Sequence, residues 1–232
     1  MKYLSLWLEA PLQSWGIDSK YYLRDSILFP SKSGVLGLLF AGSGLFGNQK
    51  KILSKMATLK QTVMASTFDG NIPKILVDFH MVGSGYDTND SWERYMIPKT
   101  SEGKKAVGGG AKLTYRNYIQ DAYFFVILEV PNELVDIFVS GLIKPIGDIF
   151  LGRKNCIPTD FIYRGVFDTE FDAEQKGLDI IKEKKLKLSY KVLDGNYYED
   201  GDVVSLSDVP LSFGDSKEYT SRRVTMVKYY EK

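Results

Sequence analysis

The run YIQDAYFFVILEV at residues 118–130 is the feature that most limits how this chain can fold. It is rich in aromatic and β-branched residues, which is typical of buried strands. Pro131 and Asn132 follow at once, and the apolar residues after them repeat at helical spacing until Lys144. The sequence therefore predicts a long strand that leads directly into an amphipathic helix.

The same order of strand and then helix is expected earlier in the chain. Residues 2–9 predict a buried strand, and residues 35–46 carry apolar side chains on one helical face, with Ser33 as the expected N-cap. The other expected elements are a short helix at 52–59, strands at 62–68 and 74–82, a charged helix at 173–185 and a last strand at 222–230.

This order predicts an α+β fold with the ferredoxin-like (RRM-like) split βαβ arrangement, in which helices cover one face of an antiparallel sheet. We expect a core at 1–165, interrupted by an insertion at 83–114, and a small C-terminal β-rich extension at 166–232. The other face of the sheet is expected to stay available, as it does in many RNA-binding modules.

Composition excludes several classes of protein. The chain is 44% hydrophobic and 25% charged, which is ordinary for a globular protein. Its one cysteine, Cys156, forbids an internal disulfide, and no Cys/His cluster has zinc spacing, so we expect no metal or other cofactor. The apolar stretch at 35–47 is too short to cross a bilayer, and the N-terminus lacks the features of a signal peptide. We therefore expect a cytoplasmic protein with no membrane partner.

Two motifs suggest enzyme chemistry, and we favour a structural interpretation of both. Residues 42–47, GSGLFG, match G-x-G-x-x-G, but the preceding residues have a helical period, so glycine here is expected to end a helix. Asp78 and His80 share one face of a predicted strand, which is more typical of a hydrogen-bonded structural pair than of a catalytic one. Cys156 is interpreted as a small buried residue.

The segment 83–114 is rich in glycine and leads into a basic stretch that contains tyrosines. Between Arg94 and Tyr118 the basic residues are Arg94, Lys99, Lys104, Lys105, Lys112 and Arg116, against a single acid, Glu102. Cations neutralise phosphates, and aromatic rings stack on splayed bases at about 1–3 kcal/mol per base. A solvated surface loop explains this composition equally well, and Gly152-Arg153-Lys154 is a second basic cluster with the same ambiguity.

Several segments together resemble the CasD family, whose members bind the 5′ handle of the CRISPR RNA in type I-E Cascade complexes. The segments are LEAPLQSWG (8–16), FPSKSGVLGLL (29–39), DFH (78–80), YRNYIQDAYFFVIL (115–128) and LGRKNCIP (151–158). They stand in the family's order, whereas the C-terminal residues match weakly. The resemblance implies a non-catalytic RNA-binding subunit in antiviral defence, with a protruding thumb that we place at 83–114.

The resemblance also implies partners and contact residues. The partners are the CRISPR RNA and the backbone and large subunits of Cascade, with target DNA reached only through the complex. Together with Lys112 and Tyr118 of the basic segment, the residues expected to contact RNA are Gln13, Trp15, Gly16, Lys32, Ser33, Gly34, Arg116, Arg153 and Lys154. The helix start at Ser33 and Gly34 is expected to offer amides to a phosphate, and Arg116 is the strongest single candidate.

Two enzymatic functions remain as alternatives. A metal-independent endoribonuclease that processes CRISPR RNA precursors would need a general base and a group that stabilises developing charge, for which His80 and Lys112 or Arg116 are the candidates. A dinucleotide-dependent enzyme would use the glycine motif at 42–47. Cleavage of a repeat RNA, or co-purifying cofactor absorbance, would reveal these activities.

Overall fold

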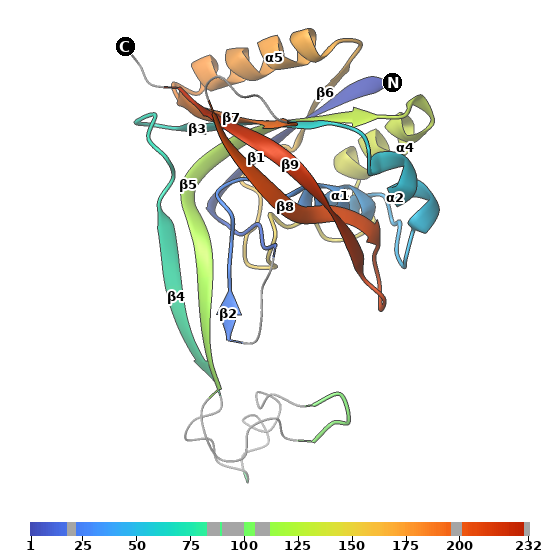
Figure 1. Cartoon of the computed structure of the whole chain (residues 1–232), viewed down its shortest axis with the longest axis vertical. Coiled ribbons are helices and arrows are strands. Elements are labelled where there is room, and N and C mark those ends of the chain that lie inside the picture. Colours follow the sequence, from blue (N-terminus) through green and yellow to red (C-terminus); the bar gives the residue numbers. More distant parts are fainter. Residues whose placement is uncertain (18–21, 83–88, 90–99, 105–111, 196–200, 230–232) are drawn as a thin grey trace.

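An antiparallel sheet with helices on both faces forms the body of the protein (Figure 1). The computed structural model describes residues 1–17, 22–82, 89, 100–104, 112–195 and 201–229. Within these residues the sheet has nine strands, seven of them in the order β6-β1-β5-β3-β7-β9-β8, and β2 and β4 pair with β5 outside this path. None of the helices described is long and apolar enough to span a bilayer.

The N-terminal part of the chain has the split βαβ arrangement that the sequence predicts. Its elements are β1 (Lys2–Gln13), α1 (Lys32–Gly42), α2 (Lys50–Met56), β3 (Gln61–Thr67), β5 (Lys112–Val130), α4 (Asn132–Ile143) and β6 (Tyr163–Phe167). Strand β5 lies between β1 and β3 and is antiparallel to both, and β1 lies between β5 and β6. Each βαβ unit therefore encloses a strand of the other unit.

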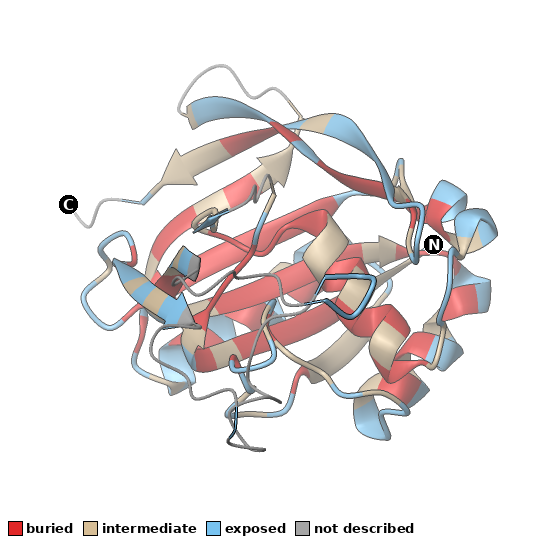
Figure 2. Ribbon diagram, turned by 90° about the horizontal axis from the view of Figure 1, so that it is seen from below, coloured by how far each residue is buried: buried red, intermediate tan, exposed pale blue. Residues whose placement is uncertain are grey.

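Helices α1 and α4 cover one face of the sheet, and the central strands beneath them are buried (Figure 2). The rings of Phe40 and Phe138 stack with their centres 5.9 Å apart, one from each helix. A Cβ atom on Gly42 would lie 2.6 Å from the carbonyl oxygen of Gly141. The two helices can therefore approach this closely only because both positions are glycine.

The other face of the sheet is covered by α5 (Glu170–Glu183), so the expectation of an available face is wrong. Trp7 and Phe125 point to this face and pack against Ala173 and Ile181 of α5. The outer side of α5 is mostly charged, so the mean hydropathy of the helix is low. Its apolar stripe is therefore hard to recognise in the sequence. Burial of that stripe requires an apolar sheet surface, which alternate residues of β1 and β5 provide.

The C-terminal extension continues the same sheet. Its strands are β7 (Lys187–Asp194), β8 (Gly201–Ser212) and β9 (Glu218–Lys228). Strand β7 pairs with β3, and β9 joins β7 to β8. The β8–β9 hairpin returns to the first helix, where the Lys32 amide donates to the Asp208 carboxylate over 2.7 Å.

Strand β4 (Ile75–Val82) pairs with the first part of β5 to form a ribbon, here called the arm, that extends away from the body (Figure 1). The short strand β2 (Leu23–Arg24) pairs in parallel with the same part of β5. The expected thumb at 83–114 falls mostly outside the described residues. Phe79 and Tyr115 are opposite each other on the arm, and both are exposed.

Two local predictions at α1 have different outcomes. The N-cap is Ser31 and not Ser33, because the Ser31 hydroxyl accepts from the Gly34 amide and Ser33 lies inside the first turn. The helix ends at Gly42, and Gly44 adopts a φ of 68°, so the glycine motif ends a helix as predicted. The residues before the motif are helical, which contradicts the strand that a dinucleotide-binding loop would need.

Candidate nucleic-acid-binding pocket

A pocket of about 340 Å³ lies where the loop after β1 meets the start of α1 and the end of the β8–β9 hairpin. We call it the Trp15 pocket. Its walls come from residues 14–16, 24–25, 31, 33–34 and 152–153 and from Phe213 and Tyr219. Its size is within the range of small-ligand sites. Three of the segments that carry the family resemblance therefore meet at one place.

Gln13 and Trp15 form an interior support of this pocket. Both side chains are buried. The Gln13 amide donates to the carbonyls of Leu8 (3.1 Å) and Ala122 (2.8 Å), and its oxygen accepts from Trp15 Nε1 over 3.2 Å. A Cβ on Gly34 would lie 2.7 Å from the Trp15 ring, so only glycine lets α1 rest on this indole. Gln13 and Trp15 thus hold the wall in shape from within.

Gly152 allows the loop before Arg153 to pack closely against the loop after β1. The Ser14 amide donates to the Leu151 carbonyl over 3.1 Å. Gly152 has a φ of 96°, and a Cβ there would lie 1.6 Å from the Ser14 carbonyl oxygen. Position 152 therefore requires glycine, both because of its positive φ and because a side chain would collide with the backbone of Ser14. Gly16, expected from the sequence to contact RNA, lies exposed in this wall.

Arg153 lies between an aromatic ring and strand β2. Its guanidinium is 4.7 Å from the centre of the Tyr118 ring, and its Nη2 donates to the Arg24 carbonyl over 2.6 Å. The buried Tyr118 accepts a hydrogen bond from Asn155 Nδ2 over 3.0 Å. Nη1 of Arg153 is buried and has no partner among the described residues. The pocket wall therefore contains a cationic donor whose hydrogen-bonding capacity is unfilled, next to the exposed Lys154.

The start of α1 is more fully occupied than the sequence predicts. Ser31 Oγ accepts from the Gly34 amide over 3.3 Å, and Asp208 accepts from the Lys32 amide. Ser33 and Gly34 remain half-buried in the pocket wall. Of the two amides expected to be free for a phosphate, that of Gly34 thus has a protein partner, and the neighbouring Lys32 amide is bound to a carboxylate.

The Lys32 side chain does not reach the pocket, although the sequence places it among the RNA contacts. It is buried, and its ammonium group donates to the carbonyls of Leu59 and, over 3.0 Å, Ala57. Burial lowers the pKa of Lys32 to about 8. The ammonium group joins the start of α1 to the end of α2 in the interior, so it serves the fold.

A buried ionic cluster anchors the β8–β9 hairpin at the pocket. Arg222 donates through Nε and Nη2 to the two oxygens of Asp208, each over 2.7 Å, and its Nη1 bonds to Asp194. The Asp208 side chain is fully buried. Since Asp208 also accepts from the Lys32 amide, the cluster fixes the hairpin relative to α1 and holds Phe213 and Tyr219 at the pocket.

Arg116 lies outside the pocket but next to its rim. It is in register with Arg24 of β2 on one side and with Asp78 of β4 on the other. Arg153, Arg24 and Arg116 therefore form a basic strip that runs from the pocket onto the arm. Lys112 is the first residue of β5, in register with Val82.

Four pocket residues are not predicted from the sequence, namely Arg24, Asp25, Phe213 and Tyr219. Arg24 lies in strand β2, which has only two residues, and Asp25 follows it. So short a strand has no recognisable periodicity of hydrophobic residues. Phe213 and Tyr219 flank the hairpin turn at Gly214, in a region where the family resemblance is weak. The sequence feature that could have indicated these two residues is the presence of an aromatic residue on each side of the turn.

The described residues contain no group of three or more His, Cys, Asp or Glu side chains placed to hold a metal ion. Cys156 is buried, as predicted, and burial raises the pKa of its thiol. His80 lies on the arm in register with Thr114, away from the pocket residues.

Comparisons with known proteins match nearly the whole chain. The sequence profile of the CRISPR-associated protein Cas5 family matches residues 3–225. The Cascade subunit CasD of the CRISPR system of Escherichia coli (strain K12) is 25% identical over 205 residues, which cover 87% of this chain and 82% of that protein.

Two solved structures are also similar. A chain of a CRISPR RNA-guided surveillance complex has a TM-score of 0.71 and 25% identity, covering 97% of this chain and 89% of that one. The crystal structure of a Cas protein has a TM-score of 0.62 and 22% identity, covering 97% and 94% of the two chains, and supports the fold alone.

Proposed function

The chain belongs to the Cas5 family of CRISPR-associated proteins, and we propose that it binds the 5′ handle of the CRISPR RNA in a type I-E Cascade complex without cutting it. The observation that carries this proposal is the Trp15 pocket. Its walls combine segments of the family resemblance with the guanidinium group of Arg153, and Tyr219 provides an aromatic ring.

The basic strip supplies the affinity in this proposal. Arg153, Arg24 and Arg116 lie on neighbouring segments, so successive phosphates of a single strand can each meet a cation. The Arg153 guanidinium group lies in the pocket wall, where it can pair with a phosphate oxygen of the RNA. Single-stranded RNA exposes its base edges, so the pocket beside the strip can receive a splayed base.

We propose two roles for the expected contact residues. Direct contacts are assigned to Gly16, Ser33, Gly34, Arg116, Arg153 and Lys154, with Arg24 and Tyr219 added. Gln13, Trp15 and Tyr118 are buried and act by holding this surface in place. Lys112 stays a prediction.

The arm is proposed to carry the thumb and to contact the neighbouring subunits of the complex. Val77, Phe79 and Met81 are each more than half exposed on one face of β4. Exposed apolar patches of this kind mark protein interfaces. The proposed partners are the backbone subunits and the large subunit, with target DNA reached through the assembled complex in the cytoplasm.

Co-expression with a CRISPR array and the candidate partner proteins tests this function. We expect purification through this chain to recover the partners and a transcript that begins with the handle. Binding of a labelled handle RNA is then compared between the wild type and the double variant Arg24→Gln/Arg153→Gln, which we expect to bind at least tenfold more weakly because two phosphate contacts are lost.

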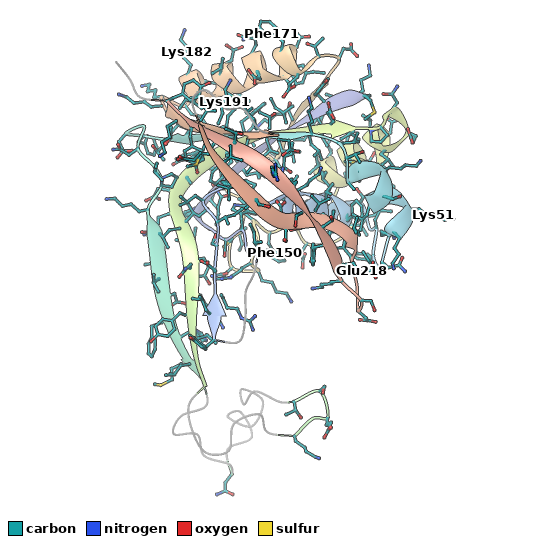
Figure 3. The ribbon with its side chains drawn as sticks, in the orientation of Figure 1. Lys51, Phe150, Phe171, Lys182, Lys191 and Glu218 are labelled. Atoms are coloured by element: carbon teal, nitrogen blue, oxygen red, sulfur yellow. The ribbon has the colours of Figure 1, made fainter. Side chains whose placement is uncertain are left out.

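The matched control removes the same charge elsewhere. Lys176→Gln/Lys182→Gln alters α5, which covers the opposite face of the sheet; Figure 3 shows Lys182 there, far from Glu218 at the end of the hairpin. Equal weakening by the two double variants would mean that only net charge matters and would contradict the assigned site.

A second candidate function, a metal-independent endoribonuclease, rests on the register of the arm. His80 pairs with Thr114, and the neighbouring pair Asp78–Arg116 lies on the same face of the ribbon. This places a possible general base near a cation. Incubation of the pure protein with a labelled repeat RNA in the presence of a chelator decides between the functions, because specific cleavage that is lost in His80→Ala would support the nuclease.

A further inference from the structure

We propose that the Trp15 pocket is a subsite for one unpaired nucleotide of the bound RNA, in which Tyr219 stacks on the base and Asp25 selects a base that carries an amino group. This inference rests on the proposed function and extends it from RNA binding to base selection. It uses residues that the family resemblance does not cover.

Asp25 is an acid in a wall that otherwise offers cations and hydroxyl groups. Its Oδ1 accepts from Asn117 Nδ2 over 2.8 Å and from the Ser26 amide over 2.7 Å. Its Oδ2 has no partner in the part of the chain that the structure describes. Asn117 and Ser26 thus hold the carboxylate in one orientation and leave one oxygen for a ligand.

A fixed carboxylate beside an RNA-binding strip would repel phosphates and weaken binding unless it accepts hydrogen bonds from the ligand. An ionised carboxylate can only accept. The amino groups of adenine, cytosine and guanine are donors, and carboxylates pair with such groups in nucleic-acid recognition. Uracil has no amino group, and its single donor on this edge, N3–H, lies between two carbonyl oxygens that would repel the Asp25 oxygen. The carboxylate therefore selects against uracil through repulsion.

Tyr219 supplies the stacking surface in this arrangement. Its side chain lines the pocket and is 44% exposed, so part of it is accessible to a ligand. The hairpin that carries Tyr219 is held in position. The Phe213 amide, at the other end of the turn, donates to the Asn48 carbonyl over 3.0 Å, and the Asp208–Arg222 pair anchors the strands. A base between Tyr219 and the opposite wall would have its phosphate near the guanidinium groups of Arg24 and Arg153.

Base selection is tested with handle RNAs in which each position in turn carries each of the four bases. For the wild type we expect one position at which uracil weakens binding about tenfold or more relative to the preferred amino-bearing base. Asp25→Asn is expected to abolish this discrimination, because an amide can also donate to a uracil carbonyl. Asp25→Glu, which keeps the charge, is the control for loss of packing.

Stacking is tested at the same position with 2-aminopurine in the RNA. Binding of the wild type and of Tyr219→Phe should quench its fluorescence, and Tyr219→Ala should lose the quenching and about tenfold in affinity. Tyr229→Ala is the matched control, since Tyr229 is similarly exposed at 43% and its ring contacts Lys191 instead of the pocket.

The outcomes separate this inference from the proposed function. If the wild type binds the handle but no position discriminates against uracil, or none is quenched, the nucleotide subsite is wrong and the RNA-binding function stands. Unchanged discrimination in a folded Asp25→Asn protein also overturns the role of Asp25. Absence of handle binding by both the isolated chain and the co-expressed complex contradicts the proposed function itself.

Discussion

The Arg153 guanidinium lies 4.7 Å from the centre of the Tyr118 ring, and the same guanidinium donates to the Arg24 carbonyl on strand β2. This one side chain therefore connects the long strand β5 to β2, and both strands contribute cations to the basic strip. Asn155 bonds to the hydroxyl group of Tyr118 and holds the ring beneath the guanidinium. Residues 151–158 thus determine the geometry of a surface formed mainly by other segments.

Arg153→Lys should destabilise the protein by about 1–3 kcal/mol, even though it keeps the charge. Lysine lacks the planar fork that stacks on Tyr118 while bonding to the Arg24 carbonyl. Urea unfolding measures the change. Lys154→Ala is the control: this neighbouring side chain is exposed, so the free energy of unfolding should change by less than about 0.5 kcal/mol. Equal effects of the two substitutions would contradict the structural role of Arg153.

Gly152→Ala should cost more than about 2 kcal/mol of folding free energy. The φ of 96° is strained for alanine, and the new methyl group would lie 1.6 Å from the Ser14 carbonyl oxygen. Gly37→Ala is the opposite case, because α1 is helical there and nothing lies within 4 Å of the new Cβ atom. That variant should be stabilised by about 0.5–1 kcal/mol. Thermal and urea unfolding of both variants check the pair, and a stable Gly152→Ala would show that the loop can rearrange.

The sequence predicted the arrangement of the core because local patterns determine it. The run at 118–130 forms part of β5, and the helical periods at 35–46 and after Asn132 correspond to α1 and α4. Strand β5 is joined to α4 by Pro131 alone, and strand–helix–strand crossovers have a fixed hand, so few arrangements remain and the split βαβ order follows from the pattern.

The pocket could not be predicted in the same way because it is formed by long-range contacts. Asp208 and Lys32 are far apart in the sequence, and no local pattern indicates that a hairpin carboxylate binds the first helical amide. That contact occupies the Lys32 amide and places a carboxylate next to the helix start, where the sequence predicts a site for a phosphate. The Lys32 ammonium group is buried for a related reason, since its partners at the end of α2 become neighbours only in the folded chain.

Asp208→Asn should destabilise the protein by about 3–5 kcal/mol, because it leaves the Arg222 guanidinium with an incomplete set of acceptors in a buried site. Asp202→Asn is a matched control on the same two strands. Asp202 pairs with Lys228 over 3.1 Å, but its side chain is 66% exposed, so its loss should cost less than about 1 kcal/mol. Urea unfolding measures both variants. If the two variants lost similar amounts of unfolding free energy, burial of the Asp208–Arg222 pair would not increase its contribution to stability.

Lys32→Met should change how stability depends on pH. Burial lowers the pKa of Lys32 from 10.5 to about 8, so the folded protein releases this proton at a pH where the unfolded chain still binds it. The contribution of Lys32 to the free energy of unfolding therefore rises between about pH 8 and 10.5, by up to about 3 kcal/mol. Below pH 8 the lysine is charged in both states and this contribution is constant.

Urea unfolding of the wild type and Lys32→Met at several pH values between 7 and 10.5 measures the difference. Other groups titrate equally in both proteins, so their contributions cancel. The wild type should gain stability relative to the variant as the pH rises above 8. A constant difference would mean that the amine keeps its proton in the folded state over this whole range.

Arg116→Ala should weaken handle binding and reduce its dependence on salt. Each phosphate contact on a single strand contributes about 0.7 to the slope of log affinity against log salt concentration, so the loss of one contact should lower the magnitude of the slope by about 0.7. Titrations of labelled handle RNA at four or more salt concentrations measure it. Lys176→Ala on α5 removes one charge from the opposite side of the sheet and should leave the slope unchanged. An unchanged slope in Arg116→Ala would instead limit the basic strip to Arg24 and Arg153.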